Sequence, residues 1–188
     1  MPNLPRSLEL ASREDTRLLI VDMQEKFVPV IDEIEDVIEN CVKLMSGAKI
    51  LGIPISATEQ YPKGLGSTIP AIAAHLEGKI PEKLDFSCLN ALDWAESGHE
   101  PDGRSRVIVA GIETHVCILQ TALDLLAYGF RVYIPADAVS SRRSFDYEVA
   151  LQRMAESGAV ITTTESILFE LCQTAAAPEF KEISRLVK

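Results

Sequence analysis

The sequence predicts an α/β fold of three layers, in which helices cover both faces of a doubly wound, mostly parallel sheet of six strands. Short apolar runs rich in β-branched residues alternate along the chain with longer segments whose apolar residues recur at helical spacing. The chain has 188 residues, 47% of them hydrophobic, which is enough to bury one continuous core. We therefore expect a single domain over residues 1–188, with residues 1–16 as a loose N-terminal lead-in.

Each expected element follows from its own pattern and its boundary residues. The expected strands are apolar runs at 18–21, 53–57, the edge strand that leads into Lys83, 107–110, 131–135 and 159–162. The expected helices are amphipathic segments at 34–51, 69–76, 90–97, the segment after Gly111 up to Leu126, 144–158 and 164–171. Residues 58–66 are rich in Gly and Pro and predict an irregular loop, and the tail from Ala175 is expected to be helical only in part.

Composition excludes several classes of function. The chain has 18 basic and 28 acidic residues, a formal charge of −10, which argues against a nucleic-acid partner or an anionic membrane surface. No apolar run is long enough to cross a membrane, and residues 1–16 lack the apolar centre of a secretory signal, so the cytoplasm is the expected location. The four cysteines are scattered without a C-x-x-C pair, as in a chain with reduced thiols: Cys41, Cys88, Cys117 and Cys172.

The stretch from Val107 to Leu123 predicts a strand, a tight turn at Gly111 and a helix. This turn places Cys117 near the first turn of the helix, where unpaired N–H groups and the helix dipole would lower the pKa of a thiol. The resulting thiolate would be a nucleophile. The alternative is that Cys117 fills space between helix and sheet, as free cysteines often do.

Three titratable groups follow strand ends or helix starts, namely Asp22, Lys83 and Cys117. Such positions converge on one edge of a doubly wound sheet, so the three groups could share a cleft. The ammonium would then stabilise the thiolate while Asp22 accepts and returns a proton during attack on a carbonyl. Each group also has an ordinary alternative, because Asp22 could cap a helix or form a turn and Lys83 could lie in solvent.

The motifs around these groups resemble those of the isochorismatase-like cysteine hydrolases, the family of nicotinamidases and N-carbamoyl amide hydrolases. The resemblance rests on residues 19–24 (LIVDMQ), on Lys83 ahead of Phe86 and Ser87, and on residues 111–117 (GIETHVC). It covers residues 17–167, and the loop 58–66 together with residues 140–142 looks most like the small stand-alone isochorismatase-domain proteins.

The resemblance implies a catalytic triad of Asp22, Lys83 and Cys117, with Cys117 as the nucleophile. It also implies a cis peptide bond between Ile112 and Glu113, which would aim the N–H groups of Glu113 and Cys117 at an oxyanion. The remaining expected roles lie in substrate binding, where a few residues near the strand ends would position the loop or line the pocket: Gln24, Phe27, Tyr61, Phe86 and Ile112.

The chain departs from the nicotinamidases, which carry an Asp-x-His pair and a further histidine as metal ligands near the second strand. Residues 57–60 (ATEQ) stand there instead, so no metal or other cofactor is expected and nicotinamide becomes a poorer candidate substrate. Isochorismate hydrolases cleave an ether without a cysteine nucleophile, so Cys117 favours an acyl substrate. A Cys117–His115 dyad is ranked below the triad, because a two-residue offset on a helix points side chains apart.

The predicted function is that of a metal-free cysteine hydrolase that acts on an amide or carbamoyl C–N bond of a small molecule. The alternative from a different class is a catalytically silent protein-binding module with the same fold. A nucleotide-cofactor protein ranks below both because no glycine fingerprint follows Asp22 or the central strand. A homo-oligomer is expected, and Arg142 and Arg143 could bridge its interface, bind an anionic substrate group or face solvent.

Overall fold

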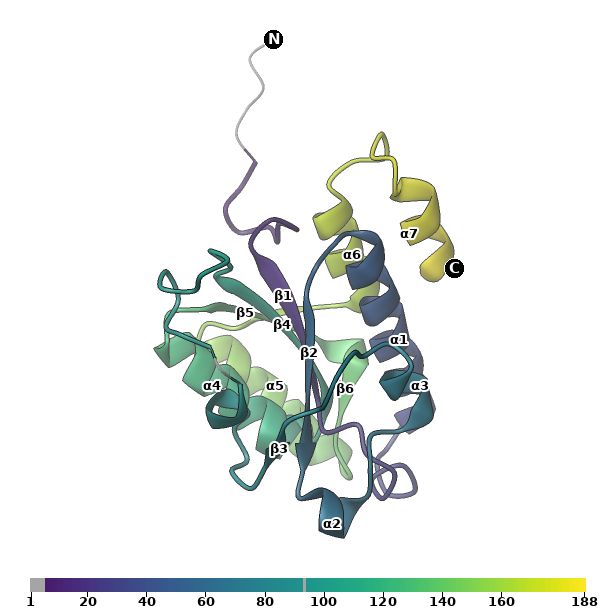
Figure 1. Cartoon of the computed structure of the whole chain (residues 1–188), viewed down its shortest axis with the longest axis vertical. Helices are drawn as coiled ribbons and strands as arrows, with labels where there is room; N and C mark the ends of the chain where they lie inside the picture. The colour runs from purple at the N-terminus through teal and green to yellow at the C-terminus, as the bar shows by residue number, and fades with distance from the viewer. Residues whose placement is uncertain (1–5, 93) are drawn as a thin grey trace.

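A computed structural model of the chain describes residues 6–92 and 94–188 (Figure 1). Within these residues a sheet of seven strands has the order β3-β2-β1-β4-β5-β7, with β6 paired to β4, and all of these pairings are parallel. The strands are β1 (Thr16–Val21), β2 (Ile55–Gln60), β3 (Glu82–Lys83), β4 (Arg106–Ile112), β5 (Arg131–Pro135), β6 (Val139–Ser140) and β7 (Val160–Thr162). The predicted fold class is confirmed. The strand that the sequence missed is β6, whose two residues pair with the end of β4.

Helices cover both faces of the sheet and complete the three layers (Figure 1). The helical elements are α1 (Ile34–Ile50), α2 (Pro62–Leu65), α3 (Pro70–Ala73), η1 (Leu89–Ala91), η2 (Thr114–Ile118), α4 (Leu119–Ala127), η3 (Ala136–Ala138), α5 (Ser144–Glu156), α6 (Thr164–Cys172) and α7 (Phe180–Leu186). Helices α1, α6 and α7 pack on one face, and α4 and α5 pack on the other. A hydrophobic core lies on each face of the sheet, the first under α1, α6 and α7 and the second under α4 and α5. Side chains of β1 alternate between them, with Leu18 and Ile20 in the first core and Leu19 and Val21 in the second.

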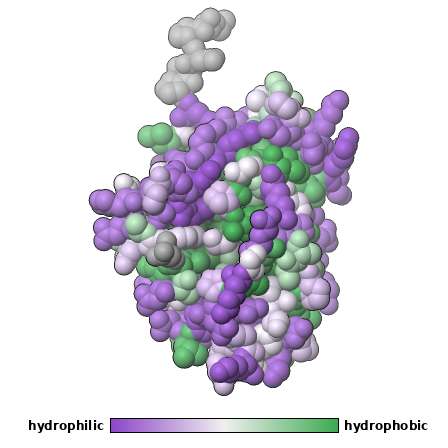
Figure 2. Space-filling model, in the orientation of Figure 1, coloured by the Kyte–Doolittle hydropathy of each residue, from purple (hydrophilic) through white to green (hydrophobic). Residues whose placement is uncertain are grey.

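The surface is mainly hydrophilic on the face shown in Figure 2, where the hydrophobic side chains lie in separate patches. In the part of the chain that the structure describes, no helix is both long and apolar enough to cross a membrane.

Two local predictions were wrong. The expected loop over 58–66 is instead partly regular, because Thr58 pairs with Val21 of β1, Glu59 and Gln60 pair with β3, and Pro62–Leu65 forms α2. The expected helix over 90–97 is only the three-residue turn η1. There the ring of Trp94 lies 4.6 Å from the Arg17 guanidinium, and this contact is made from a non-helical segment.

Several boundaries also differ from the predicted ones. The helix expected over 69–76 is the four-residue α3. The tail is helical in part, as expected, because it contains α7. The first five residues of the expected lead-in and residue 93 of the expected 90–97 helix lie outside the described residues.

The two central strands, β1 and β4, are where the strand order reverses. From β1 the chain moves outward to β2 and β3, and from β4 it moves the opposite way to β5 and β7. In open parallel sheets a crevice forms at the carboxyl ends of the strands at such a switch point. Asp22 follows β1 and the segment Glu113–Cys117 follows β4, so both candidate groups lie at this crevice.

Candidate active site

Asp22 is held at the end of β1 by an unusual backbone conformation. Its φ angle is +52°, in the left-handed region that aspartate tolerates better than most residues. The Asp22 N–H donates to the Thr58 carbonyl at 3.1 Å, and the Asp22 carbonyl accepts from the Gln24 N–H at 2.8 Å. The side chain is fully buried, so a carboxylate is fixed at the crevice with no access to bulk water.

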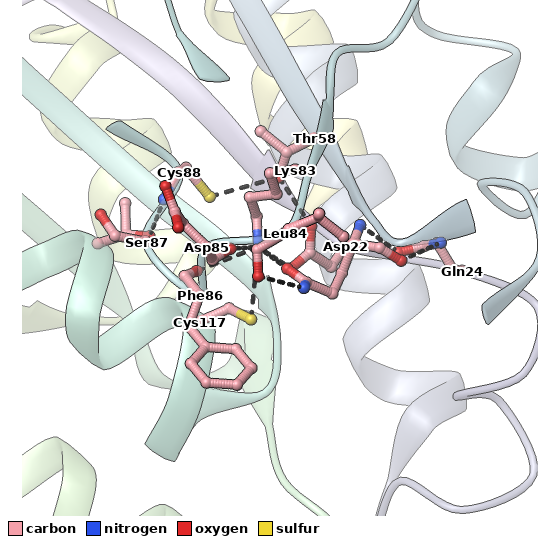
Figure 3. A network of polar contacts seen from close by, with 12 residues as sticks. Asp22, Gln24, Thr58, Lys83, Leu84, Asp85, Phe86, Ser87, Cys88 and Cys117 are labelled. Carbon is pink, nitrogen blue, oxygen red and sulfur yellow. Dashed lines mark hydrogen bonds and ion pairs between the residues drawn. The ribbon is translucent and has the colours of Figure 1, made fainter. Parts of the chain in front are cut away.

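Lys83 lies at the end of β3 and points its ammonium at buried acceptors (Figure 3). Its Nζ donates to Asp22 Oδ2 at 2.7 Å, to Gln60 Oε1 at 2.6 Å and to the Phe86 carbonyl at 3.0 Å. These oxygens can only accept, so Lys83 must be protonated to satisfy them. Its side chain is 2% exposed, which rules out the solvent-facing alternative.

Cys117 lies within reach of the same ammonium, because Lys83 Nζ is 3.5 Å from Cys117 Sγ. The cysteine belongs to η2, a π-helical turn that directly follows β4 and Glu113. Gly111 brings β4 close to β1, since its φ is +113° and a Cβ there would lie 2.2 Å from the Val21 carbonyl oxygen. The structure thus brings Asp22, Lys83 and Cys117 together from three separate strand ends.

The predicted lowering of the Cys117 pKa was wrong. Burial raises the pKa of the Cys117 thiol above its ordinary value, the Asp22 charge adds to this effect, and the Lys83 ammonium only partly opposes it. The helix-dipole argument failed because Cys117 sits in a π-helical turn ahead of α4 and is only 4% exposed. This shift favours the thiol over the thiolate in the protein without substrate.

Burial also shifts its two partners. Burial raises the pKa of Asp22 in spite of the Lys83 ammonium, so Asp22 is a stronger base than a solvated aspartate. Burial alone would lower the pKa of Lys83, but the nearby charge of Asp22 outweighs it and the pKa is raised. The site therefore combines a permanent cation, a carboxylate base and a protonated thiol.

Two further site residues, Thr58 and Gln60, emerge only from the structure. The Thr58 hydroxyl donates to Asp22 Oδ1 at 2.8 Å, and Gln60 accepts from Lys83 while its Nε2 donates to the Leu84 carbonyl at 3.0 Å. The two residues are two positions apart in β2, so their side chains lie on the same face of the strand. Extending the second predicted strand past Ala57 would have placed both at the same sheet edge as Asp22.

Gln24 holds the backbone around the site together instead of facing a ligand. Its Nε2 donates to the carbonyls of Gln60 and Gly66 at 3.1 and 2.6 Å, and its Oε1 accepts from the Gln60 N–H at 2.7 Å. The pocket roles expected for Phe27 and Ile112 are not supported, because Phe27 is half-buried against the core and Ile112 is buried within it.

Tyr61 and Phe86 are accessible, at 50% and 52% exposure, as is Leu84 at 76%. A cavity of about 230 Å³ lies beside Lys83 and is lined by Tyr61, Pro62, Lys63, Glu82, Lys83 and Leu84. A larger cavity of about 560 Å³ lies elsewhere, along α1, η3 and α5, and none of the three titratable groups lines it. Of the three titratable groups, Lys83 lines the smaller cavity, and Asp22 and Cys117 line neither of the two.

The turn that carries Cys117 is fastened to the loop before α5. The buried Glu113 carboxylate accepts from Arg142 Nε at 2.9 Å and from the Arg142 N–H at 3.2 Å, and His115 Nδ1 lies 2.9 Å from Ser141 Oγ. His115 thus has a partner other than Cys117, while Arg143 is exposed. The peptide bond between Ile112 and Glu113 is cis.

No group of three or more His, Cys, Asp and Glu side chains arranged to hold a metal ion occurs in residues 6–92 and 94–188.

Comparison with known protein families gives one family match. The isochorismatase domain model matches residues 16–166. A zebrafish relative, isochorismatase domain-containing protein 1, is 46% identical over 89% of this chain, which spans 59% of that relative's length. Mouse isochorismatase domain-containing protein 2A is 43% identical over 93% of this chain and 84% of its own length.

One further relative and one solved structure bear on location and fold. The secreted isochorismatase effector Isc1 of Phytophthora sojae is 41% identical over 91% of this chain and 83% of its own, so a cytoplasmic location stays a prediction. The solved structure of the MAR1 ribonuclease of Caenorhabditis elegans is 37% identical and superposes with a TM-score of 0.85. That match covers 95% of this chain and 92% of the other.

Proposed function

The chain belongs to the isochorismatase family of hydrolases, and from this premise we propose that it is a metal-free cysteine hydrolase. It cleaves the C–N bond of a small amide or carbamoyl compound, with Asp22, Lys83 and Cys117 as the catalytic residues. The observation that carries the proposal is the position of one buried ammonium, 2.7 Å from a carboxylate oxygen and 3.5 Å from a thiol sulfur.

The first step forms a thioester. The Cys117 sulfur bonds to the substrate carbonyl carbon while its proton passes to Asp22, whose raised pKa suits a proton acceptor. The C–N bond then breaks, and Asp22 returns the proton to the departing nitrogen. The Lys83 ammonium keeps its protons throughout and stabilises the negative charge on sulfur.

The second step releases the acid. A water molecule attacks the thioester carbon and gives a proton to Asp22, the C–S bond breaks, and Asp22 returns that proton to the sulfur. The thiol is restored and the carboxylic or carbamic acid leaves. All bonds and protons are accounted for without an oxidant or a cofactor.

Backbone donors are the candidates for holding the oxyanion that forms in both steps. Within residues 6–92 and 94–188, neither the Glu113 N–H nor the Cys117 N–H donates a backbone hydrogen bond in a loop, a turn or a helix cap. One such donor contributes about 3 kcal/mol to stabilisation of a transition state in comparable hydrolases. Glu113 is fixed by Arg142, so its N–H is held in place before substrate arrives.

The surroundings favour a small substrate with an apolar or aromatic part. Tyr61, Leu84 and Phe86 are exposed beside Lys83, whereas Cys117 itself is only 4% exposed. The Phe86 and Leu84 carbonyls accept from Lys83 Nζ and Gln60 Nε2, which ties this apolar rim to the buried polar groups.

The test is release of ammonia or amine from a panel of small amides, N-carbamoyl compounds and aromatic amides. We expect turnover of at least one member by the wild-type protein and none by Cys117→Ala. Cys172→Ala is the control. Cys172 is the last residue of α6 and is buried in the first core, on the opposite face of the sheet from Cys117.

Two outcomes would contradict the proposal. Turnover that survives Cys117→Ala would exclude the thiol as nucleophile. Absence of turnover over the whole panel, together with cleavage of single-stranded RNA, would favour the activity named for the nematode relative, and absence of both would favour the protein-binding alternative.

A further inference from the structure

A third buried group reaches Asp22 from the side opposite Lys83. Thr58 Oγ1 lies 2.8 Å from Asp22 Oδ1 and 3.3 Å from Cys88 Sγ, while Lys83 occupies Asp22 Oδ2. Thr58 is 1% exposed, and Cys88 and Asp22 are fully buried. Cys88 is itself positioned by its N–H, which donates to Thr121 Oγ1 at 3.0 Å. Figure 3 shows Cys88 and Thr58 joined on one side of Lys83 and Cys117 on the other.

The number of hydrogens decides how this chain of contacts works. A hydroxyl carries one hydrogen, so when Thr58 donates it to an ionised Asp22, the contact to Cys88 requires the thiol to be the donor. Burial raises the pKa of Cys88 to about 11, so this thiol has a proton to give at neutral pH. Every polar hydrogen in this series of side-chain contacts then has an acceptor.

The same chain can also run in the other direction. Once Asp22 is protonated on Oδ1, that oxygen becomes a donor and Thr58 must accept from it. The Thr58 hydrogen then needs a new acceptor, which the Cys88 sulfur supplies as a weak acceptor, while the Cys88 S–H, a weak donor, turns away from Thr58. Lys83 cannot reverse in this way because an ammonium has no lone pair.

We propose that Cys88 and Thr58 form a reversible hydrogen-bond relay behind Asp22 that satisfies both its ionised and its protonated state. Cys88 is thus a positioning residue for the proton transfer between Cys117 and Asp22. The inference rests on the proposed function, in which the Cys117 proton passes to Asp22 and the sulfur keeps the bonding electron pair.

The relay predicts a specific effect of each substitution. In Cys88→Ala the ionised Asp22 keeps its hydrogen bond from Thr58. When Asp22 is protonated, however, the Thr58 hydrogen has no acceptor. Asp22 then takes a proton less readily, so the proton stays on Cys117 and more alkaline solution is needed to free the thiolate. Thr58→Val removes the relay altogether, whereas Cys88→Ser keeps both a donor and an acceptor.

The test measures the rate at which iodoacetamide alkylates Cys117 between pH 6 and pH 10, followed by peptide mass analysis. At pH 7 we expect the Cys117 rate in Cys88→Ala and Thr58→Val to fall about fivefold, the equivalent of one hydrogen bond, with the pH profile displaced to higher pH. Cys88→Ser is expected to stay within about twofold of wild type because its hydroxyl preserves the hydrogen bonds.

The matched control is Cys41→Ala, which also deletes a buried thiol. Cys41 Sγ contacts the Ala138 carbonyl at 3.6 Å and has no place in the relay, so its variant is expected to keep the wild-type profile. Thermal unfolding of each variant shows whether a slow rate reflects loss of the fold instead, and the Cys88→Ser variant restores the rate only if the hydrogen bonds matter.

The outcomes separate the relay from the proposed function. If wild-type Cys117 reacts but its pH profile is unchanged in Cys88→Ala and Thr58→Val, or if Cys88→Ser behaves like Cys88→Ala, the relay is overturned while the nucleophile stands. If wild-type Cys117 reacts no faster than Cys41 at any pH, both the nucleophile and the relay are overturned.

Discussion

Lys83 is the residue on which the other polar groups of the site depend. Its ammonium is the shared partner of a carboxylate, an amide oxygen and a thiol, all of them buried. In Lys83→Met the Asp22 carboxylate and Gln60 Oε1 lose this partner without gaining water. We expect the free energy of unfolding in urea at pH 7 to fall by about 3 kcal/mol, the usual effect of breaking a buried ion pair.

The matched control for that variant is Lys79→Met. Lys79 has an 85% exposed side chain and a 3.9 Å contact with Glu82, so its loss is expected to change the unfolding free energy by less than about 0.5 kcal/mol. Equal stability of the two variants would show that the Lys83 contacts carry no net energy.

Three buried thiols give the protein a characteristic response to alkali. Burial raises the pKa of Cys117, Cys88 and Cys41, the latter two to about 11 and about 12. A group with a raised folded pKa contributes stability that is complete below its unfolded pKa and is lost as the pH rises toward the folded value. Between pH 9 and pH 10 the unfolded thiols ionise first, so the unfolding free energy falls.

The slope approaches about 1.4 kcal/mol per pH unit for each of these thiols as its unfolded form becomes fully ionised. Urea unfolding under reducing conditions at pH 9.0, 9.5 and 10.0 measures how the unfolding free energy changes with pH. Cys41→Ala should lower this slope by the contribution of one thiol. An unfolding free energy that is flat or rises over this interval would mean that the thiols are not protonated in the folded state.

Residue-level chemistry was partly visible in the sequence. Asp22 and Cys117 were found because each follows a run of apolar residues that could only be a buried strand. The direction of the Cys117 pKa shift was not visible, because it depends on burial by segments far away in the chain. Thr58, Gln60 and Cys88 were missed because their partners come from other elements, Asp22 after β1, Lys83 in β3 and Thr58 in β2, and no local pattern shows which of these lie side by side.

At the level of elements, the β4-to-η2 connection is what places the nucleophile. Gly111 ends the straight part of β4 next to Val21, with φ at +113° and no room for a side chain. A Gly111→Ala substitution would drive its Cβ into the Val21 backbone, which cannot move without separating β1 from β4. We expect a loss of more than about 3 kcal/mol in unfolding free energy, measured by urea denaturation, or failure to fold.

Gly52→Ala is the control for that substitution. Gly52 also has a positive φ, at +68°, but no atom lies within 4 Å of the position of an added Cβ. Its cost is therefore limited to the backbone, about 1 kcal/mol. Similar losses at both positions would contradict the close approach of β1 and β4 at Gly111.

Element-level prediction succeeded where a pattern was long and failed where tertiary pairing decided the outcome. The helix over 34–51 was predicted almost to its boundaries, because its amphipathic spacing runs for four turns and ends at a glycine. The end of β2 was misread as loop because Thr58–Gln60 is polar, and only its pairing with Val21 of β1 and with β3 makes it a strand. The π-helical form of η2 has no signal in the sequence.

At the level of the whole molecule, the exposed apolar side chains point to self-association. Phe145 on α5 is 73% exposed and Leu84 beside the site is 76% exposed, and an interface between copies of the chain would remove such apolar surface from water. We predict a homo-oligomer. Light scattering should give a multiple of 20.6 kDa at micromolar concentration, and a mass of 20.6 kDa at every concentration would contradict the prediction.

The most direct test of the central claim is to find where the acyl group goes. The protein is mixed with p-nitrophenyl acetate, quenched in acid within seconds and digested, and the acetylated peptides are identified by mass. We predict one dominant thioester on Cys117, with its formation slowed at least tenfold in Lys83→Met. Acetyl groups spread over surface lysines, or on another cysteine, with Cys117 unmodified, would contradict the account.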